Sequence, residues 1–156
     1  MLARGTVGAV ALGLVAVFAA AQPTYLILSS YSDASCDPAT MLPFNLTVPL
    51  GSCLNNHDFD KAPCEVLQGC VTNLTAVYGP TVPYEAMVNC TAAPSMHLSV
   101  LPTYDAAASE LEVKVYAISK ACWGLGLPLH FASGACASTF AVSKHCGVSG
   151  ASVSWV

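Results

Sequence analysis

The sequence predicts an all-β protein, a small disulfide-bonded β-sandwich in which two pseudo-repeats pack together. Three observations support this class. Apolar and polar residues alternate along several short segments, as they do in half-buried strands. The 156 residues include ten Pro and eleven Gly, which interrupt helices and keep strands short. Eight Cys in so short a chain are typical of small extracellular domains held by disulfides.

The expected strands follow from these patterns along the chain. Residues 25–28 form a short apolar run that suits a buried strand. Residues 96–100, 111–115 and 151–155 alternate between the two faces of a sheet. After residue 21 no segment keeps an apolar period of 3.6 residues, so no helix longer than about one turn is expected.

The N-terminus has the features of a secretory signal peptide, residues 1–21. Arg4 supplies a positive charge, residues 7–18 are apolar, and small residues at 19–21 form a cleavage site before Gln22. The uncharged stretch is shorter than the roughly 20 residues that span a bilayer. We therefore expect a secreted protein, extracellular or at the cell surface, without stable membrane insertion. The alternative is an uncleaved signal anchor.

An internal repeat divides the mature chain into a first Cys-rich β half, residues 22–95, and a second, residues 96–156. In both halves a Tyr precedes the first Cys, and a Leu-Pro pair and a Gly-x-Cys motif follow it. The corresponding positions are Tyr31 and Tyr116, Cys36 and Cys122, Cys53 and Cys136, and Cys64 and Cys146.

All eight Cys are expected to form disulfides: Cys36, Cys53, Cys64, Cys70, Cys90, Cys122, Cys136 and Cys146. A disulfide that closes a loop of roughly 15 residues stabilises a fold by about 3 kcal/mol, so these bonds would replace a large core. The repeat favours Cys36–Cys53 and Cys122–Cys136 as equivalent bonds within the halves. Cys64–Cys146 would then join the halves, and Cys70–Cys90, which have no counterparts, would bond to each other. No C-x2-C pair is present, so a zinc site is not expected.

The segment of residues 31–36, followed by Gly51-Ser52-Cys53 and a later half-copy, resembles small secreted Cys-rich proteins of unicellular eukaryotes that are internally duplicated β proteins. The resemblance implies an extracellular, disulfide-bonded β protein and brings no catalytic residue with it. Asn-x-Thr sequons at Asn45, Asn73 and Asn89 also predict N-linked glycans.

Composition and motifs argue against several classes of function. Beyond residue 21 the chain has no Arg and only four Lys against nine acidic residues, so no nucleic-acid partner is expected. Residues 56–60 resemble the start of a calcium loop, but Lys61 and Leu67 occupy its Gly and Glu positions. Neither H-E-x-x-H nor G-x-S-x-G occurs; two carboxylates that meet only in the folded chain stay an open alternative. We expect no enzyme activity, metal or cofactor.

The first functional hypothesis is a structural subunit of an extracellular filament, sheath or cell-surface matrix. A chain with 9% charged residues has little to protect its strand edges, and open edges add to neighbouring sheets. Copies of the same chain would be the main partner. The expected assembly strands lie at the two ends of the mature chain and contain Tyr25, Leu26, Ile27, Leu28, Val153, Trp155 and Val156.

The alternative hypothesis is a soluble, monomeric module that binds a carbohydrate or a protein. It predicts a compact face without glycans. The best candidate for the contact is the loop of residues 123–126, where the Trp123 ring could stack on a sugar, although aromatic residues more often fill the core of small β domains.

Overall fold

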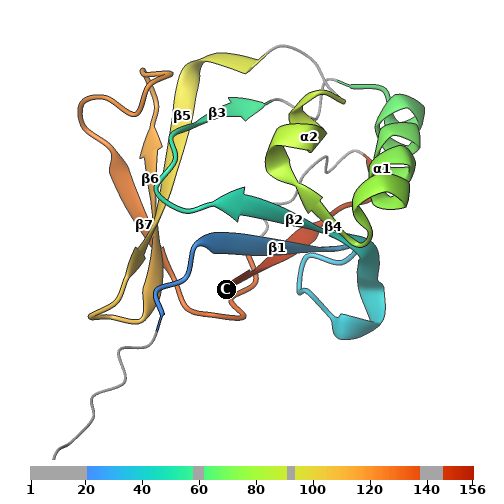
Figure 1. Cartoon of the computed structure of the whole chain (residues 1–156), viewed down its shortest axis with the longest axis horizontal. Helices are drawn as coiled ribbons and strands as arrows, with labels where there is room; N and C mark the ends of the chain where they lie inside the picture. Colours follow the sequence, from blue (N-terminus) through green and yellow to red (C-terminus); the bar gives the residue numbers. More distant parts are fainter. Residues whose placement is uncertain (1–20, 58–61, 91–93, 138–145) are drawn as a thin grey trace, which may run out of the picture.

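A computed structural model of the chain describes residues 21–57, 62–90, 94–137 and 146–156 (Figure 1). The described residues form two four-stranded sheets, two α-helices and four disulfides, so the structure is a small, mostly β, disulfide-rich fold as predicted. The expected signal segment lies outside the described residues, apart from Ala21. Within those residues, no helix has the length and apolar character needed to cross a membrane.

Sheet A contains, in spatial order, β4 (Thr81–Pro83), β2 (Met41–Pro49), β1 (Tyr25–Tyr31) and β8 (Gly150–Trp155). The 3-10 helix η1 (Pro38–Thr40) lies between β1 and β2 in the chain. β1 is antiparallel to both of its neighbours, with Leu28 opposite Leu46 on one side and Val153 on the other. β4 pairs with β2 in the parallel direction.

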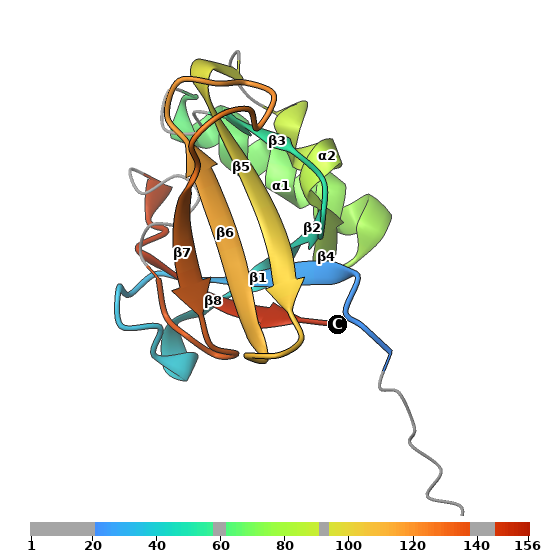
Figure 2. The ribbon, with the colours of Figure 1, turned by 90° about the vertical axis from the view of Figure 1, so that its left-hand side faces the viewer.

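Sheet B contains, in spatial order, β3 (Leu54–His57), β5 (Pro94–Asp105), β6 (Glu110–Tyr116) and β7 (Leu127–Phe131). All its pairings are antiparallel, and β5 and β6 form a hairpin with Asp105 opposite Glu110. The strands of sheet A run across those of sheet B (Figure 2).

The core lies between the two sheets and continues under the helices. Alternate residues are buried in β6, which explains its period-two sequence pattern, and Leu26 and Leu28 of β1 are buried likewise. Leu46 and Val153 of sheet A and Leu111 of sheet B are fully buried. Leu67 and Met87 extend the same core to the helices.

The two helices, α1 (Cys64–Tyr78) and α2 (Tyr84–Val88), differ from the sequence-based expectation of no helix longer than about one turn. α1 contains several β-branched residues, and only Leu67 of its side chains is buried, so its apolar stripe is weak. Two disulfides attach the helix to the rest of the fold. Cys64–Cys146 fixes the start of α1, and Cys70–Cys90 joins α1 to the chain just after the end of α2.

Two of the four predicted disulfides are confirmed, Cys64–Cys146 and Cys70–Cys90. The other two predictions, Cys36–Cys53 and Cys122–Cys136, are wrong, because the bonds are Cys36–Cys136 and Cys53–Cys122. The cause is the path of the chain. After β2 the chain crosses to the outer edge of β5, where Gly51 N donates to Pro102 O at 2.7 Å. After β7 it crosses to the outer edge of β8, where Gly134 N donates to Val153 O at 2.7 Å.

The same crossings show how the sequence repeat is expressed in three dimensions. Positions that align in the sequence share unusual backbone angles, since φ is 56° at Cys36 and 54° at Cys122, and 81° at Gly51 and 82° at Gly134. Exchanging the two halves converts one crossed disulfide into the other. We call β8-β1-β2 in sheet A and β5-β6-β7 in sheet B the two units; in each unit, the loop with the positive-φ Cys joins the second strand named to the third.

Strands β1 and β8 are not open edges, contrary to the expectation for residues Tyr25, Leu26, Ile27, Leu28, Val153, Trp155 and Val156. β1 is paired on both sides. The outer edge of β8 is hydrogen bonded by the segment after β7, for example Ala137 N to Ala151 O at 2.8 Å. The ends pair with each other instead, since Val156 N donates to Tyr25 O at 3.0 Å.

The remaining sheet edges are short or obstructed. β4 has three residues and ends at Pro83, and β7 contains Pro128, which has no N–H to donate. On β3, the carbonyl oxygen of Asn55 accepts a hydrogen bond from Tyr84 Oη at 3.1 Å. Short strands with Pro are a common protection against edge-to-edge pairing.

Candidate functional site

The three sequons lie on sheet A and on the two helices. Asn45 is half-buried in β2, Asn73 is exposed on α1, and Asn89 is exposed at the C-terminal end of α2. Figure 1 shows both helices beside sheet A, far from β6 and β7. Strands β6 and β7 of sheet B and the connection between them contain no sequon.

The connection from β6 to β7 carries the three most exposed large apolar side chains of the described residues. We call residues 117–127 the apolar loop; its last residue is the first of β7. The exposed fractions are 98% for Leu125, 90% for Ile118, 79% for Trp123 and 66% for Leu127. Exposed apolar side chains that gather in one place mark interaction surfaces.

The apolar loop is exposed but firmly held. The disulfide Cys53–Cys122 ties its centre to the residue before β3. Ser119 Oγ accepts hydrogen bonds from the backbone N–H groups of Ala121 at 3.2 Å and Trp123 at 3.0 Å. Fully buried Ser99 of β5 donates its hydroxyl to Ser119 O at 2.7 Å and accepts from Cys122 N at 3.0 Å. The loop is therefore preorganised, which lowers the entropy lost when it binds a partner.

The loop folds back over the outer face of sheet B. A Cβ atom added to Gly126 would lie 2.8 Å from two ring carbons of Tyr116 and 3.3 Å from Cβ of Lys114. Tyr116 is consequently buried although it lies on the same face as Lys114. Only glycine fits at this position without moving the loop.

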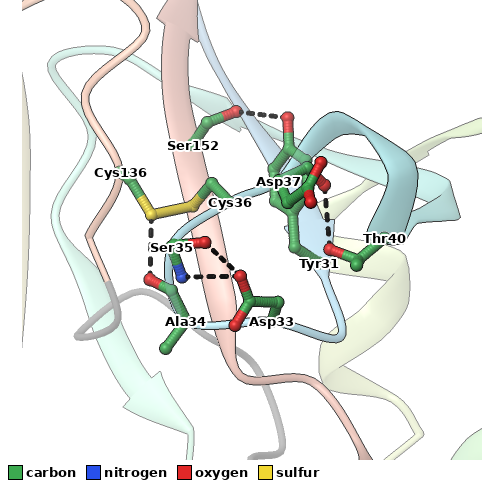
Figure 3. The surroundings of a disulfide bond; sticks show 9 residues. All are labelled: Tyr31, Asp33, Ala34, Ser35, Cys36, Asp37, Thr40, Cys136 and Ser152. Carbon is green, nitrogen blue, oxygen red and sulfur yellow. Dashed lines mark hydrogen bonds between the residues drawn. A yellow bond between two sulfur atoms is a disulfide. The ribbon is translucent and has the colours of Figure 1, made fainter.

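The equivalent connection of the other unit, residues 32–40 between β1 and β2, is the polar loop (Figure 3). Asp33 accepts hydrogen bonds from the backbone N–H of Ser35 at 3.2 Å and from its hydroxyl. The hydroxyl of Ser35 holds the pKa of Asp33 below its ordinary value of 3.8. Asp37 Oδ1 caps η1 by accepting from Ala39 N at 2.9 Å.

The disulfide Cys36–Cys136 closes the polar loop against the segment that lines β8. Figure 3 shows Sγ of Cys136 beside the carbonyl oxygen of Ala34, 3.1 Å away. At the base of the loop, the hydroxyl of buried Tyr31 is hydrogen bonded to Ser152 Oγ at 3.1 Å. Like the apolar loop, the polar loop is thus held by a disulfide and by hydrogen bonds to side-chain oxygens.

The titratable groups of sheet B form a surface cluster. Glu112 Oε1 lies 3.0 Å from Lys114 Nζ, and this hydrogen-bonded contact raises the pKa of Lys114. His130 lies 4.0 Å from Glu110 and 3.9 Å from Glu112, with all these side chains partly exposed. No trio of His, Cys, Asp or Glu within the described residues is placed to hold a metal ion. Asp58 and Asp60 of the segment compared with a calcium loop lie outside the described residues.

A cleft of about 220 Å³ lies between β2, α1 and the segment after Cys146. It is lined by Leu42, Pro43, Phe44, Leu67, Gln68, Val71, Thr72, Met87, Cys146 and Val148. The lining has no carboxylate, imidazole, amine or free thiol, so it offers no acid, base or strong nucleophile for catalysis.

Comparison with protein-family models, curated proteins and solved structures finds no match to this chain.

The candidate site is therefore built from this chain's residues alone, and it is the apolar loop. The sequence had indicated Trp123 and its neighbours through the Gly-spaced apolar run. It had not indicated Ile118 or the hydroxyl of Ser99, which supports the loop by a hydrogen bond to Ser119, 20 residues later in the chain. The alternation of residues 96–100 placed Ser99 in a strand but gave no sign of its partner.

Proposed function

We propose that this chain is a secreted, non-enzymatic binding module that contacts a cell surface through the apolar loop. The observation that carries the proposal is a set of four exposed apolar side chains on one firmly held loop, Ile118, Trp123, Leu125 and Leu127. Exposing them to water costs free energy that a binding partner would recover, at about 25 cal/mol for each Å² covered.

The covalent frame supports an extracellular site of action. All eight Cys are bonded, which requires an oxidising compartment. Together with the signal-like residues 1–21 and three sequons, this favours secretion.

The sequons support the choice of the apolar loop over other apolar surfaces. On α1, Val66 and Val77 are also exposed, but Asn73 lies seven residues after one and four before the other, on the same helix face. A glycan on Asn73 would cover both. The apolar loop has no sequon beside it in the chain and would stay accessible.

The proposal is tested by binding of the oxidised, fluorescently labelled chain to intact cells, both eukaryotic and bacterial, measured by flow cytometry. We expect Trp123→Ala combined with Leu125→Ala to reduce cell binding at least tenfold. Val77→Ala, at an apolar position of α1 outside the apolar loop, is the control and should bind normally. Cell binding that is absent, or equally strong for the loop variant, would refute the proposal.

Self-assembly into an extracellular filament or matrix is the second candidate. A low content of charged residues, 9%, favours it because repulsion between copies is weak. The protected sheet edges mean that copies would meet through loops and faces rather than by strand addition. Sedimentation velocity and negative-stain microscopy that show only monomers at high concentration would exclude this candidate.

A further inference from the structure

We propose that the partner of the apolar loop is an anionic phospholipid surface, into whose interfacial layer Trp123 and Leu125 insert while Lys120 meets the phosphates. This inference rests on the proposed function and specifies the class of partner. The contact is peripheral and reversible and needs no membrane-spanning segment.

The first argument is the size and shape of the exposed surface. Leu125 and Ile118 are 98% and 90% exposed, so their side chains stand clear of the rest of the chain. Four such side chains offer a few hundred Å², whereas a stable protein complex buries roughly 800 Å² on each partner. A bilayer interface accepts a small projecting apolar group directly, because no complementary pocket is needed.

The second argument is charge. All nine acidic residues of the chain precede residue 113, and residues 113–156 contain three Lys and no Asp or Glu. Exposed Lys120 lies within the loop. In sheet B, Asp105 and Glu110 lie at the hairpin end of β5 and β6, and Figure 2 shows the apolar loop at the opposite end. The apolar loop would therefore bring the cation of Lys120 to the phosphates, while the carboxylates of Asp105 and Glu110 stay at the far end of the sheet.

The third argument is the combination of residue types. Trp and Lys on one loop are the residue types found where proteins meet the headgroup layer, since the indole ring is apolar with one polar N–H. The disulfide Cys53–Cys122 and the hydrogen bonds to Ser119 keep both residues in place before contact. Insertion then costs little ordering of the chain.

The experiment uses the oxidised chain from Gln22 to Val156 and sealed phosphatidylcholine vesicles, with or without about 30 mole per cent phosphatidylserine. Trp155→Phe leaves Trp123 as the only Trp, because the chain has two. We expect co-flotation with phosphatidylserine vesicles and a blue shift of Trp123 emission. Vesicles without phosphatidylserine should bind several-fold less.

Two variants and one control sharpen the result. Leu125→Asp should reduce vesicle binding at least tenfold without unfolding the chain, because this side chain is 98% exposed. Lys120→Glu should remove the preference for phosphatidylserine. Val77→Asp places the same charge at another exposed apolar position and should leave vesicle binding unchanged.

The outcomes separate the two proposals. Loop-dependent binding to cells without flotation or blue shift on phosphatidylserine vesicles would overturn the lipid assignment and point to a protein or glycan partner, while the proposed function would stand. Binding to neither cells nor vesicles would overturn both. Equal losses for Leu125→Asp and Val77→Asp would also overturn the lipid assignment, since the contact would then not belong to the loop.

Discussion

The polar loop and the apolar loop occupy equivalent places in the two related units, yet one suits water and the other a partner. Each follows a buried Tyr and contains a disulfide-bonded Cys with φ near 55°, Cys36 at 56° and Cys122 at 54°. The residue three positions before that Cys is Asp33 in one loop and Ser119 in the other. In each case its side-chain oxygen accepts a hydrogen bond from a backbone N–H two residues later. The two loops therefore share their backbone conformation, disulfide and hydrogen-bond acceptor, but differ in their exposed side chains.

The difference shows which features the fold needs. The positive φ, the disulfide and the oxygen acceptor recur in both loops, so they maintain the turn. The exposed residues do not recur: the polar loop has Asp33, Ser35 and Asp37, and the apolar loop has Ile118 and Leu125. Because folding does not require exposed Leu or Ile, their presence in one loop needs an explanation outside the fold.

The largest effect should come from removing the crossed disulfides. Replacing both Cys36 and Cys136 by Ala, or both Cys53 and Cys122, should each lower the free energy of unfolding by about 2–5 kcal/mol, since both bonds close long segments of the chain. Guanidinium denaturation measures this. Cell binding should fall only for the Cys53 and Cys122 pair; equal loss for both pairs would contradict the distinction between the loops.

The next largest losses of stability should come from replacing the glycine on which the close packing of each loop depends. A Cβ at Gly150 would lie 2.5 Å from the carbonyl oxygen of Asp33, and at Gly126 it would meet the Tyr116 ring at 2.8 Å. Both changes to Ala should destabilise by about 1–3 kcal/mol, with Gly150 the more costly because backbone is obstructed. Gly69→Ala on α1, where nothing lies within 4 Å, is the control and should be neutral or stabilising. A Gly126 variant as stable as the control would disprove close packing of the apolar loop.

Single hydroxyls should have a smaller effect. Ser99→Ala removes a buried hydroxyl that serves both Ser119 O and Cys122 N, and should cost about 1–2 kcal/mol. Tyr31→Phe removes the single contact with Ser152 at the polar loop and should cost about 1 kcal/mol or less. Thermal unfolding of both variants provides the comparison, and the reverse order would show that Ser99 does not organise the apolar loop.

The smallest effect concerns pH. Because the pKa of Asp33 is lowered in the folded chain, its carboxylate contributes stability above the ordinary pKa of 3.8, and this contribution is lost as pH falls through the lowered value. The polar loop should therefore loosen in strong acid, while Ser119 of the apolar loop does not titrate. Amide hydrogen exchange tests this when the protection of Ser35 is compared with that of Ala121. The rates are measured from about pH 5, above the ordinary pKa of 3.8, down to about pH 2, and corrected for intrinsic exchange. Protection of Ser35 that is unchanged in acid would contradict the role of the carboxylate.

The sequence revealed the local parts of this structure more fully than their connections. Alternation located β6 and β8 because one face of each strand is buried, and a short apolar run located β1. The repeat identified which Cys correspond, since Cys64–Cys146 and the two crossed bonds obey the correspondence. It could not reveal that the chain leaves each unit for the edge of the other, because that depends on packing between distant strands.

The missed helix and the missed parts of the site have similar causes. α1 is tied to the rest of the fold by disulfides at Cys64 and Cys70, and its Leu67, Val71 and Leu74 are spaced as one helix face with only Leu67 buried. The exposure of Leu125 and Ile118 follows from a loop that is anchored elsewhere, by Ser99 and Cys53. Sequence neighbours alone do not distinguish such residues from core residues.

The crossing of the chain between the units also dictates an order of events during biosynthesis. In an oxidising compartment, Cys53 becomes available to Cys36 earlier in synthesis than does Cys136, the partner of Cys36, which is 100 residues away. The adjacent pair can therefore oxidise early and must later be exchanged. Maturation of this protein is thus expected to depend on a disulfide isomerase, with β8, made last, closing the sheet that β1, made first, begins.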